Sequence, residues 1–285
     1  MFSITASVTT VSTSTRSMPA AAAVDRMSGR ELRESFLLRD LFEPGEMRIC
    51  CTDLDRMTMA GVVPAGEARL PGIPDFGTSY FTERRELGII NLGGPGVVDV
   101  GGKAWKLEAM ECLYVGTGNP KITFAQDGPG QPVFYLVSCP AHKHYPTEKS
   151  TPAEAVSEWI GESAAASRRR ITKFIHEDGI SSCQLVMGFT ELETGSVWNT
   201  MPPHTHSRRS EVYLYNGLGG GIAVHLMGEP SNTRSLIVRD REAALSPPWS
   251  IHTAAGTAAY SFIWAMAGEN QSFADMDPVA PGSLY

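Results

Sequence analysis

The residues best suited to chemistry lie in one short segment of the chain. His204 and His206 are two positions apart, so on a β-strand both imidazoles point to the same side. Glu211 begins the next apolar run, and the residues between can fold its carboxylate back beside the two rings. His252 follows a Pro-Pro-Trp-Ser-Ile run further along. Three imidazoles and one carboxylate suit Zn, Fe, Mn, Ni or Cu and are a poor match to Ca or Mg.

The spacing of these four residues is similar to that of the cupin superfamily. The cupin pattern is His-x-His-x4-Glu followed by Pro-x4-His, and Pro247 with His252 supplies the second part. Three positions depart from the pattern: Trp249 stands in place of a glycine, Gly256 stands in place of an asparagine, and the upstream Gly195 lies too far ahead of the histidines. A lone His-x-His pair is weak evidence for a metal site. The pair with a correctly spaced Glu and a distant His predicts a metal site.

Two other histidine positions have competing interpretations. His142 and His144 with Glu148 also read His-x-His-x3-Glu, but Pro146 interrupts them and no Pro-x4-His follows, so we expect no metal there. His225 lies within a β-like run. It is either a residue that supports the metal ligands from behind or, as we favour, a buried core histidine with a hydrogen bond.

Composition limits the elements that must position these residues. The chain has 285 residues, which corresponds to about two domains at roughly 150 residues each. Its 28 Gly and 19 Pro favour many tight turns and a β-rich fold. The net charge of −7, without a basic cluster, argues against nucleic acid, and no apolar run is long enough for a membrane helix. Five cysteines without a CxxC pair indicate reduced thiols and a cytoplasmic protein.

Capping signals predict two helices between the β-like runs. Ser28 and Glu31 form a capping-box pattern before an apolar face. Thr151 and Glu154 begin a second predicted helix, whose buried stripe would be Ala155, Val156, Trp159 and Ile160. The predicted organisation is a flexible tail over 1–27, a cupin-like half without metal over 28–150, a helical linker over 151–167 and a metal-bearing cupin-like half over 168–285.

A faint internal repeat relates the two halves. Residues 84–94 and 208–220 both begin with an Arg-Arg pair, continue through an apolar run and end in Gly-Gly. We therefore expect a mainly all-β fold, a duplicated cupin-like β-sandwich or β-barrel with a few short helices. Chance similarity between two hairpins is the alternative.

Longer motifs resemble one family, the 5-keto-4-deoxyuronate isomerases, also called 4-deoxy-L-threo-5-hexosulose-uronate ketol-isomerases. The resemblance covers roughly residues 28–280. It rests on the stretches Ser-Tyr-Phe-Thr-Glu-Arg-Arg-Glu-Leu-Gly-Ile-Ile-Asn (79–91), Leu-Tyr-Val-Gly (113–116), Trp-Asn-Thr-Met-Pro-Pro-His-Thr-His-Ser-Arg-Arg-Ser-Glu-Val-Tyr (198–213), Ser-Pro-Pro-Trp-Ser-Ile-His (246–252) and Phe-Ile-Trp-Ala-Met-Ala-Gly-Glu-Asn-Gln (262–271).

The resemblance implies an activity, a metal and an assembly. The family converts 5-dehydro-4-deoxy-D-glucuronate to 3-deoxy-D-glycero-2,5-hexodiulosonate, an intracellular step in the breakdown of pectin and other uronates. The resemblance implies a two-cupin fold, one zinc ion per chain and assembly into homohexamers. Carried over by matching motif, the zinc ligands are His204, His206, Glu211 and His252.

The remaining catalytic roles are open at this stage. Aldose–ketose isomerisation needs a group that carries a proton, and Glu191, one strand before the ligands, is a guess for it. The substrate carboxylate needs an Arg or Lys. Arg208 and Arg209 adjoin the ligands, although a doublet that also occurs at 84–85 is more easily structural. Lys173, with Arg168 and Arg169, competes for the role.

Two other function classes stay open. A metal-dependent cupin oxygenase would use the same ligand set with Fe(II) or Cu. A non-catalytic cupin would bind a sugar without turnover.

Overall fold

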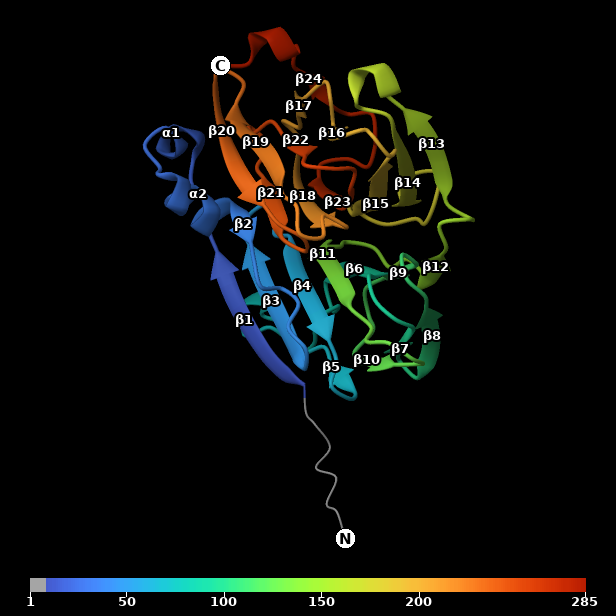
Figure 1. Cartoon of the computed structure of the whole chain (residues 1–285). Coiled ribbons are helices and arrows are strands. Elements are labelled where there is room, and N and C mark those ends of the chain that lie inside the picture. Colours follow the sequence, from blue (N-terminus) through green and yellow to red (C-terminus); the bar gives the residue numbers. More distant parts are fainter. Residues whose placement is uncertain (1–8) are drawn as a thin grey trace.

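The computed structural model describes residues 9–285, and β-strands dominate them. Figure 1 shows two halves stacked end to end, with the first half in blue to green and the second in yellow to red. Each half consists of a seven-stranded and a four-stranded sheet. The all-β prediction is confirmed. No helix within the described residues is long and apolar enough to cross a membrane.

The first half of the chain forms two sheets. Its seven-stranded sheet has, in spatial order, β1 (Thr10–Arg16), β3 (Glu46–Thr52), β4 (Thr58–Val63), β11 (Phe134–Pro140), β6 (Arg85–Asn91), β9 (Cys112–Val115) and β12 (Glu148–Ser150). Its four-stranded sheet has β5 (Ala68–Arg69), β10 (Ile122–Gln126), β7 (Gly96–Val100) and β8 (Lys103–Leu107), and a 3-10 turn, η1, covers Pro74–Phe76.

The second half repeats this arrangement. Its seven-stranded sheet has β13 (Val156–Ile160), β14 (Arg169–Ile175), β15 (Val186–Leu192), β23 (Ser261–Gly268), β18 (Arg209–Asn216), β21 (Ala243–Ser246) and β2 (Leu37–Leu38). Its four-stranded sheet has β16 (Trp198–Asn199), β22 (Thr253–Gly256), β19 (Ala223–Glu229) and β20 (Asn232–Val238). A separate pair joins β17 (His204–Thr205) to β24 (Asp277–Pro278), and 3-10 turns η2 and η3 cover Ser163–Ala165 and Pro281–Ser283.

Strand register makes the central strands of the two halves equivalent. In β6, Arg85 pairs with Pro140 and Leu87 with Ser138 on β11. In β18, Arg209 pairs with Gly268 and Glu211 with Met266 on β23. The internal repeat read from the two Arg-Arg segments therefore corresponds to two strands in the same place in their sheets.

The start of the chain departs from the predicted flexible tail. Residues 1–8 lie outside the described part, but Thr10–Arg16 form β1, which pairs in parallel with β3. The helices α1 (Ala21–Val24) and α2 (Gly29–Phe36) then lie against the second half beside β19 and β20 (Figure 1). The Ser28 capping box forms as predicted. The helix ends at Phe36, because Leu37 and Leu38 pair with β21.

The helix predicted from residue 151 is wrong. Thr151 and Glu154 do form the reciprocal capping contacts, with Glu154 N donating to Thr151 Oγ1 (3.3 Å), but only a turn follows. Residues Val156–Ile160 instead form β13, which pairs with β14 along its whole length. Val, Trp and Ile suit an extended strand, and the free edge of β14 offers backbone partners that a helix cannot use.

Three apolar clusters hold the sheets together. One fills the space between the two sheets of the first half and another that of the second half. The third joins the two seven-stranded sheets, with Ile90 and Val137 of the first half in the same cluster as Val212 and Ile263 of the second. Because this cluster is apolar and fully buried, the halves are stabilised as one unit.

Candidate metal centre

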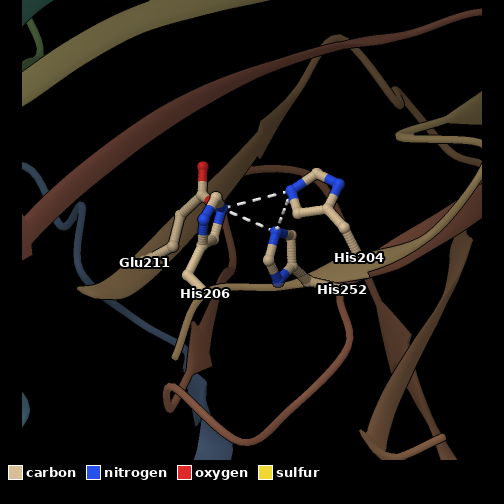
Figure 2. A group of neighbouring side chains, drawn as sticks. All are labelled: His204, His206, Glu211 and His252. Atoms are coloured by element: carbon tan, nitrogen blue, oxygen red, sulfur yellow. Dashed lines mark hydrogen bonds and ion pairs between the residues drawn. The ribbon is translucent and has the colours of Figure 1, made fainter. Parts of the chain in front are cut away.

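The four predicted ligands meet in the interior of the second half. His204 lies in β17 and Glu211 in β18, while His206 follows β17 and His252 precedes β22. Figure 2 shows their side chains converging on one point. His204 Nε2 is 3.1 Å from His206 Nε2 and 3.0 Å from His252 Nε2. Glu211 Oε2 is 3.0 Å from His206 Nε2 and 2.9 Å from His252 Nε2.

The hydrogen-bond partners of these groups are suited to holding a cation among them. His206 Nδ1 lies 2.9 Å from the main-chain oxygen of Asp275, which only accepts hydrogen bonds. This oxygen is a closer partner of Nδ1 than Arg209 Nη2, which lies 3.3 Å away. In the neutral ring Nδ1 therefore carries the proton, and Nε2 presents a lone pair to the carboxylate of Glu211. Two acceptors in contact repel each other unless a cation lies between them. Ligands of a tetrahedral ion at about 2.1 Å are about 3.4 Å apart, which is close to the spacing here.

Burial and neighbouring side chains set the protonation states of His204 and Glu211. Burial, followed by the neighbouring His252 and His206 rings, lowers the pKa of His204 to about 2, so this imidazole is neutral. Burial alone would raise the pKa of the Glu211 carboxyl, but His252 and His206 hold that pKa well below its usual range. Neutral imidazole and ionised carboxylate are the forms that bind a metal ion. Among the described residues these four form a group whose ligand atoms all lie within 4.8 Å of one another.

A cavity of about 240 Å³ opens beside this group, over the seven-stranded sheet of the second half. His204, His206 and Glu211 line it, together with Arg169 from β14 and Tyr213 from β18. The other lining residues are mostly apolar: Ile160, Ile171, Thr190, Thr200, Met201, Pro202, Phe262, Trp264, Met266, Phe273 and Met276. The cavity therefore has three of the four candidate ligands and a cation in a mostly apolar wall, as small-molecule sites do.

Arg169 is the buried cation of this cavity. Its side chain is 7% exposed, and Nη1 donates to the main-chain oxygen of Ser167 at 2.8 Å. No carboxylate of the described residues forms an ion pair with it. Burial lowers the pKa of its guanidinium, opposed by Tyr213 and Tyr260. A buried guanidinium without a carboxylate is poised to receive one from a ligand.

Tyr213 and Thr200 form a hydroxyl pair in the same wall. Their oxygens are 3.0 Å apart, and both residues are buried. Burial, and then the charge of Glu211, raise the pKa of Tyr213 well above its usual range, so its hydroxyl is a proton donor at neutral pH. Thr200 has a backbone φ of 45°, an uncommon conformation for a non-glycine residue.

The structure places the other predicted substrate-binding residues outside the cavity lining. Arg208 forms ion pairs with the carboxylates of Asp275 and Asp277. Arg209 is fully buried and donates to the main-chain oxygens of Ser272 (2.6 Å) and Asp275 (2.7 Å). Of the predicted arginines, Arg169 alone lines the cavity within the described part of the chain.

Lys173 and Glu191 are engaged elsewhere. Lys173 pairs with Glu158 at 2.7 Å, and its ammonium lies over the ring of Phe273. Glu191 alternates with Thr190 on β15, so it faces away from the cavity, where it is exposed and pairs with Arg170 at 3.4 Å. The geometry therefore gives Glu191 no route to a proton in the cavity.

The other histidines considered in the sequence, His142, His144 and His225, lie outside the ligand group. His144 is exposed and its Nδ1 lies 2.7 Å from the main-chain oxygen of Thr117, and the ligand group does not include His142 or His144. His225 is buried and hydrogen bonded to Tyr215 through Nδ1 at 2.7 Å, as expected for a core histidine. It also lies behind the site, since the Tyr213 ring contacts both His225 and His252.

The sequence reading missed the segment that follows β23. Phe273 and Met276 line the cavity, and β24 pairs with β17 over it. Asp275 contributes both a carboxylate to Arg208 and a main-chain oxygen to His206. The only signal in the sequence for this segment was the Arg208-Arg209 doublet, because two adjacent cations need acceptors. Those acceptors come from Asp275, about seventy residues further along the chain.

Comparison with known proteins places the chain in a family. A model described as the KduI/IolB family matches residues 56–279. The 4-deoxy-L-threo-5-hexosulose-uronate ketol-isomerase of Opitutus terrae is 55% identical over 270 residues, 93% of this chain and 97% of the relative. The protein of the same name from Kineococcus radiotolerans is 48% identical over 267 residues, 92% and 96% of the two chains.

Solved structures agree on the fold. An IolB-like protein from Salmonella typhimurium has a TM-score of 0.61 and 13% identity, over 78% of this chain and 86% of that one. Oxalate decarboxylase from Lactobacillus farciminis has a TM-score of 0.53 and 11% identity, over 76% and 78%. At these identities the likeness concerns the fold alone, and it confirms the duplicated cupin architecture. The family match and the relatives together show that the chain belongs to the KduI/IolB family and is an intramolecular oxidoreductase of the ketol-isomerase type.

Proposed function

We propose that this chain converts 5-dehydro-4-deoxy-D-glucuronate to 3-deoxy-D-glycero-2,5-hexodiulosonate, with a zinc ion at the His204, His206, Glu211 and His252 group. One observation carries the proposal: the ligand group and the buried, carboxylate-free Arg169 line the same cavity. The substrate carries a reacting aldehyde at one end and a carboxylate at the other. The two features of the cavity match the two ends.

The reaction moves a proton from C2 of the substrate to C1, so that the aldehyde becomes an alcohol and the C2 alcohol becomes a ketone. Its intermediate is an enediol, whose oxygens gain negative charge as the proton leaves. A bound zinc would supply a Lewis acid that polarises the carbonyl and stabilises those oxygens. Zinc suits three imidazoles and a carboxylate, and it has no redox chemistry of its own.

Arg169 orients the substrate. Its guanidinium would hold the carboxylate by charge-assisted hydrogen bonds, which are about twice as strong as neutral ones. This contact fixes the distant end of the substrate, so that C1 and C2 lie beside the ligand group. The apolar wall, including Phe262 and Trp264, excludes water and strengthens the contact.

Tyr213 is our candidate for proton donation to a substrate oxygen. Its hydroxyl is protonated at neutral pH and is positioned by Thr200. A donor beside a developing oxyanion stabilises it without being consumed.

The resemblance also supports a setting for this activity. The five cysteines are free thiols, which is the form expected in the cytoplasm. We place the reaction there, after the enzymes that cleave pectin and other uronate polymers, in a homohexamer. Sedimentation at micromolar concentration tests the assembly, and a monomer near 31 kDa would contradict it.

The deciding experiment is NMR of the keto-deoxyuronate before and after addition of purified protein, with metal analysis of the same sample. Loss of the aldehyde signals, growth of a hydroxymethyl ketone and about one zinc per chain are the expected results. Oxygen uptake with Fe or Cu bound would instead indicate an oxygenase. Saturable binding without turnover would indicate a sugar-binding cupin.

A further inference from the structure

We propose that the first half contains a second ligand site, which binds a small hydroxylated carboxylate such as a sugar acid. The site is a cavity of about 340 Å³ at the end of the first half where β6 begins and β11 ends. Arg56, Arg84 and Arg85 line it. This volume is within the range of small-molecule pockets.

Register with the second half shows what is unusual about these arginines. Arg84 and Arg85 occupy the positions of Arg208 and Arg209. In the second half, Asp275 and Asp277 neutralise Arg208, and the segment that carries Asp275 also covers Arg209.

In the described part of the first half, the segment after β11 does not cover the arginines in this way. After β11 the chain runs to β12 beside β9 and does not return over Arg84 and Arg85. Within residues 9–285, no carboxylate forms an ion pair with any of the three arginines. The place where Asp275 and Asp277 contact Arg208 in the second half therefore corresponds to an open cavity beside Arg84 in the first half.

Arg85 is a desolvated cation aimed into this cavity. Its side chain is 6% exposed, and it donates only to neutral groups: Ser138, Thr58 and the main-chain oxygen of Arg56. Nη1 has no hydrogen-bond partner in the described part of the chain. The guanidinium carbon lies 4.4 Å from the centre of the Phe76 ring, which shields one face. A buried guanidinium with a free donor edge is the partner that a carboxylate requires.

The loop that carries Arg56 is held in a fixed shape. Asp55 and Arg56 have φ values of 43° and 55°, which non-glycine residues seldom adopt. Asp55 Oδ2 accepts from Ser210 N at 2.8 Å, and the Arg56 main-chain oxygen accepts from Arg85 at 2.5 Å. Hydrogen bonds therefore hold the backbone at both Asp55 and Arg56. This conformation places the Arg56 side chain at the cavity wall.

The remaining lining selects a hydroxylated monoanion. Asp53 and Asp75 also line the cavity, so its formal charge with three arginines is +1. Thr15, Thr58 and Thr78 add hydroxyls. Carboxylates and hydroxyls bind the hydroxyl groups of a polyol, while the arginines bind its carboxylate. A dianion such as phosphate would leave excess negative charge beside Asp53 and Asp75.

Methyl NMR of the full metal-loaded chain can report on the two cavities separately. The methyl group of Thr78 reports on the first-half cavity and that of Met276 on the metal-side cavity. D-Galacturonate is the probe, and D-galactose is the uncharged match. We expect galacturonate to shift the Thr78 signal saturably and galactose to leave it unchanged.

Two variants test whether the Thr78 response comes from binding in the first-half cavity. Arg56→Ala with Arg84→Ala removes two exposed side chains that make no ion pair, and should weaken the Thr78 response at least about tenfold. Arg26→Ala, at an exposed arginine outside the cavity, should leave it unchanged. No Thr78 shift with galacturonate, or an equal shift in the double variant, would overturn the proposal. So would a stronger response to inorganic phosphate. The Met276 signal and turnover test the proposed function independently.

Discussion

Leu87 and Glu211 occupy the same position in the two halves of this chain. Each lies two residues after the buried arginine of its strand, paired with the matching residue of β11 or β23. Leu87 is fully buried in the apolar cluster of the first half, whereas Glu211 is a buried carboxylate among three imidazoles. One duplicated framework thus holds an apolar core in one half and a charged ligand group in the other.

Removing one ligand should abolish turnover more completely than it unfolds the chain. His206→Ala and His252→Ala should lose the metal, and Glu211→Gln should keep an intermediate affinity. Loss of the electrophile should lower the rate roughly a thousandfold or more. The two halves bury separate apolar clusters, so the variants should still melt cooperatively by circular dichroism.

The control for the ligand variants is His142→Ala with His144→Ala, which should leave metal content and rate unchanged. Wild-type activity in a metal-free His206→Ala protein would remove the metal from the mechanism. A His206→Ala chain that does not fold at all would make the metal structural.

Arg169→Met should mainly impair substrate binding. Without the guanidinium, the substrate carboxylate enters an apolar cavity unpaired, so KM should rise about tenfold or more. Arg169→Lys should recover part of the affinity, because it keeps the charge but not the planar fork. Steady-state kinetics measure both variants.

Arg170→Met and Glu191→Gln are the matched controls, since this pair lies on the opposite face of the same strands. Neither should change KM or kcat by more than about twofold, because no contact of theirs reaches the cavity. A large loss of kcat in Glu191→Gln would restore it as the base and contradict the geometry.

His225 should make stability fall in mild acid. Burial, and then the nearby His252, lower the pKa of His225 to about 3. The unfolded chain takes up this proton below about pH 6.5, whereas the folded chain does so only near pH 3, so the free energy of unfolding decreases as pH falls through this window. The slope from this residue is up to about 1.4 kcal/mol per pH unit.

Urea unfolding of wild type and His225→Gln at several pH values between 7 and 4 measures this effect, because the difference between the two chains cancels the contribution of the metal ligands. The variant should show the flatter profile. Parallel profiles would mean that His225 is protonated without cost in the folded state.

Glu86→Gln should loosen the contact between the halves. Its carboxylate accepts from the backbone N–H groups of Cys183 (2.7 Å), Gln184 (2.7 Å) and Leu185 (2.8 Å), and from the hydroxyl of Tyr114. The amide turns one acceptor into a donor facing these donors, so the chain should lose roughly 2 to 4 kcal/mol. Glu43→Gln, at an exposed position, should change stability by less than about 0.5 kcal/mol in the same denaturant titration.

The sequence by itself determined the ligand group and the strand framework. The period of two in extended backbone places the rings of His204 and His206 on one side, and the cupin-like spacing adds Glu211 and His252. The glycine and proline content that predicts a β-rich fold with many turns is a property of the sequence as well. The spacing of these four residues along the chain therefore names four side chains whose ligand atoms meet in the folded structure.

Tertiary structure decided the role of every charged residue around that group. Arg169, Arg208 and Arg209 are the same residue type in similar local sequence. Arg208 is neutralised by carboxylates from a distant segment, Arg209 is covered by main-chain oxygens, and Arg169 is left without a carboxylate in the cavity. Likewise, Val156–Ile160 carries a helical pattern and became a strand because the edge of β14 was unpaired. Charge and backbone pairing depend on which partners arrive from far along the chain, and no local pattern contains that information.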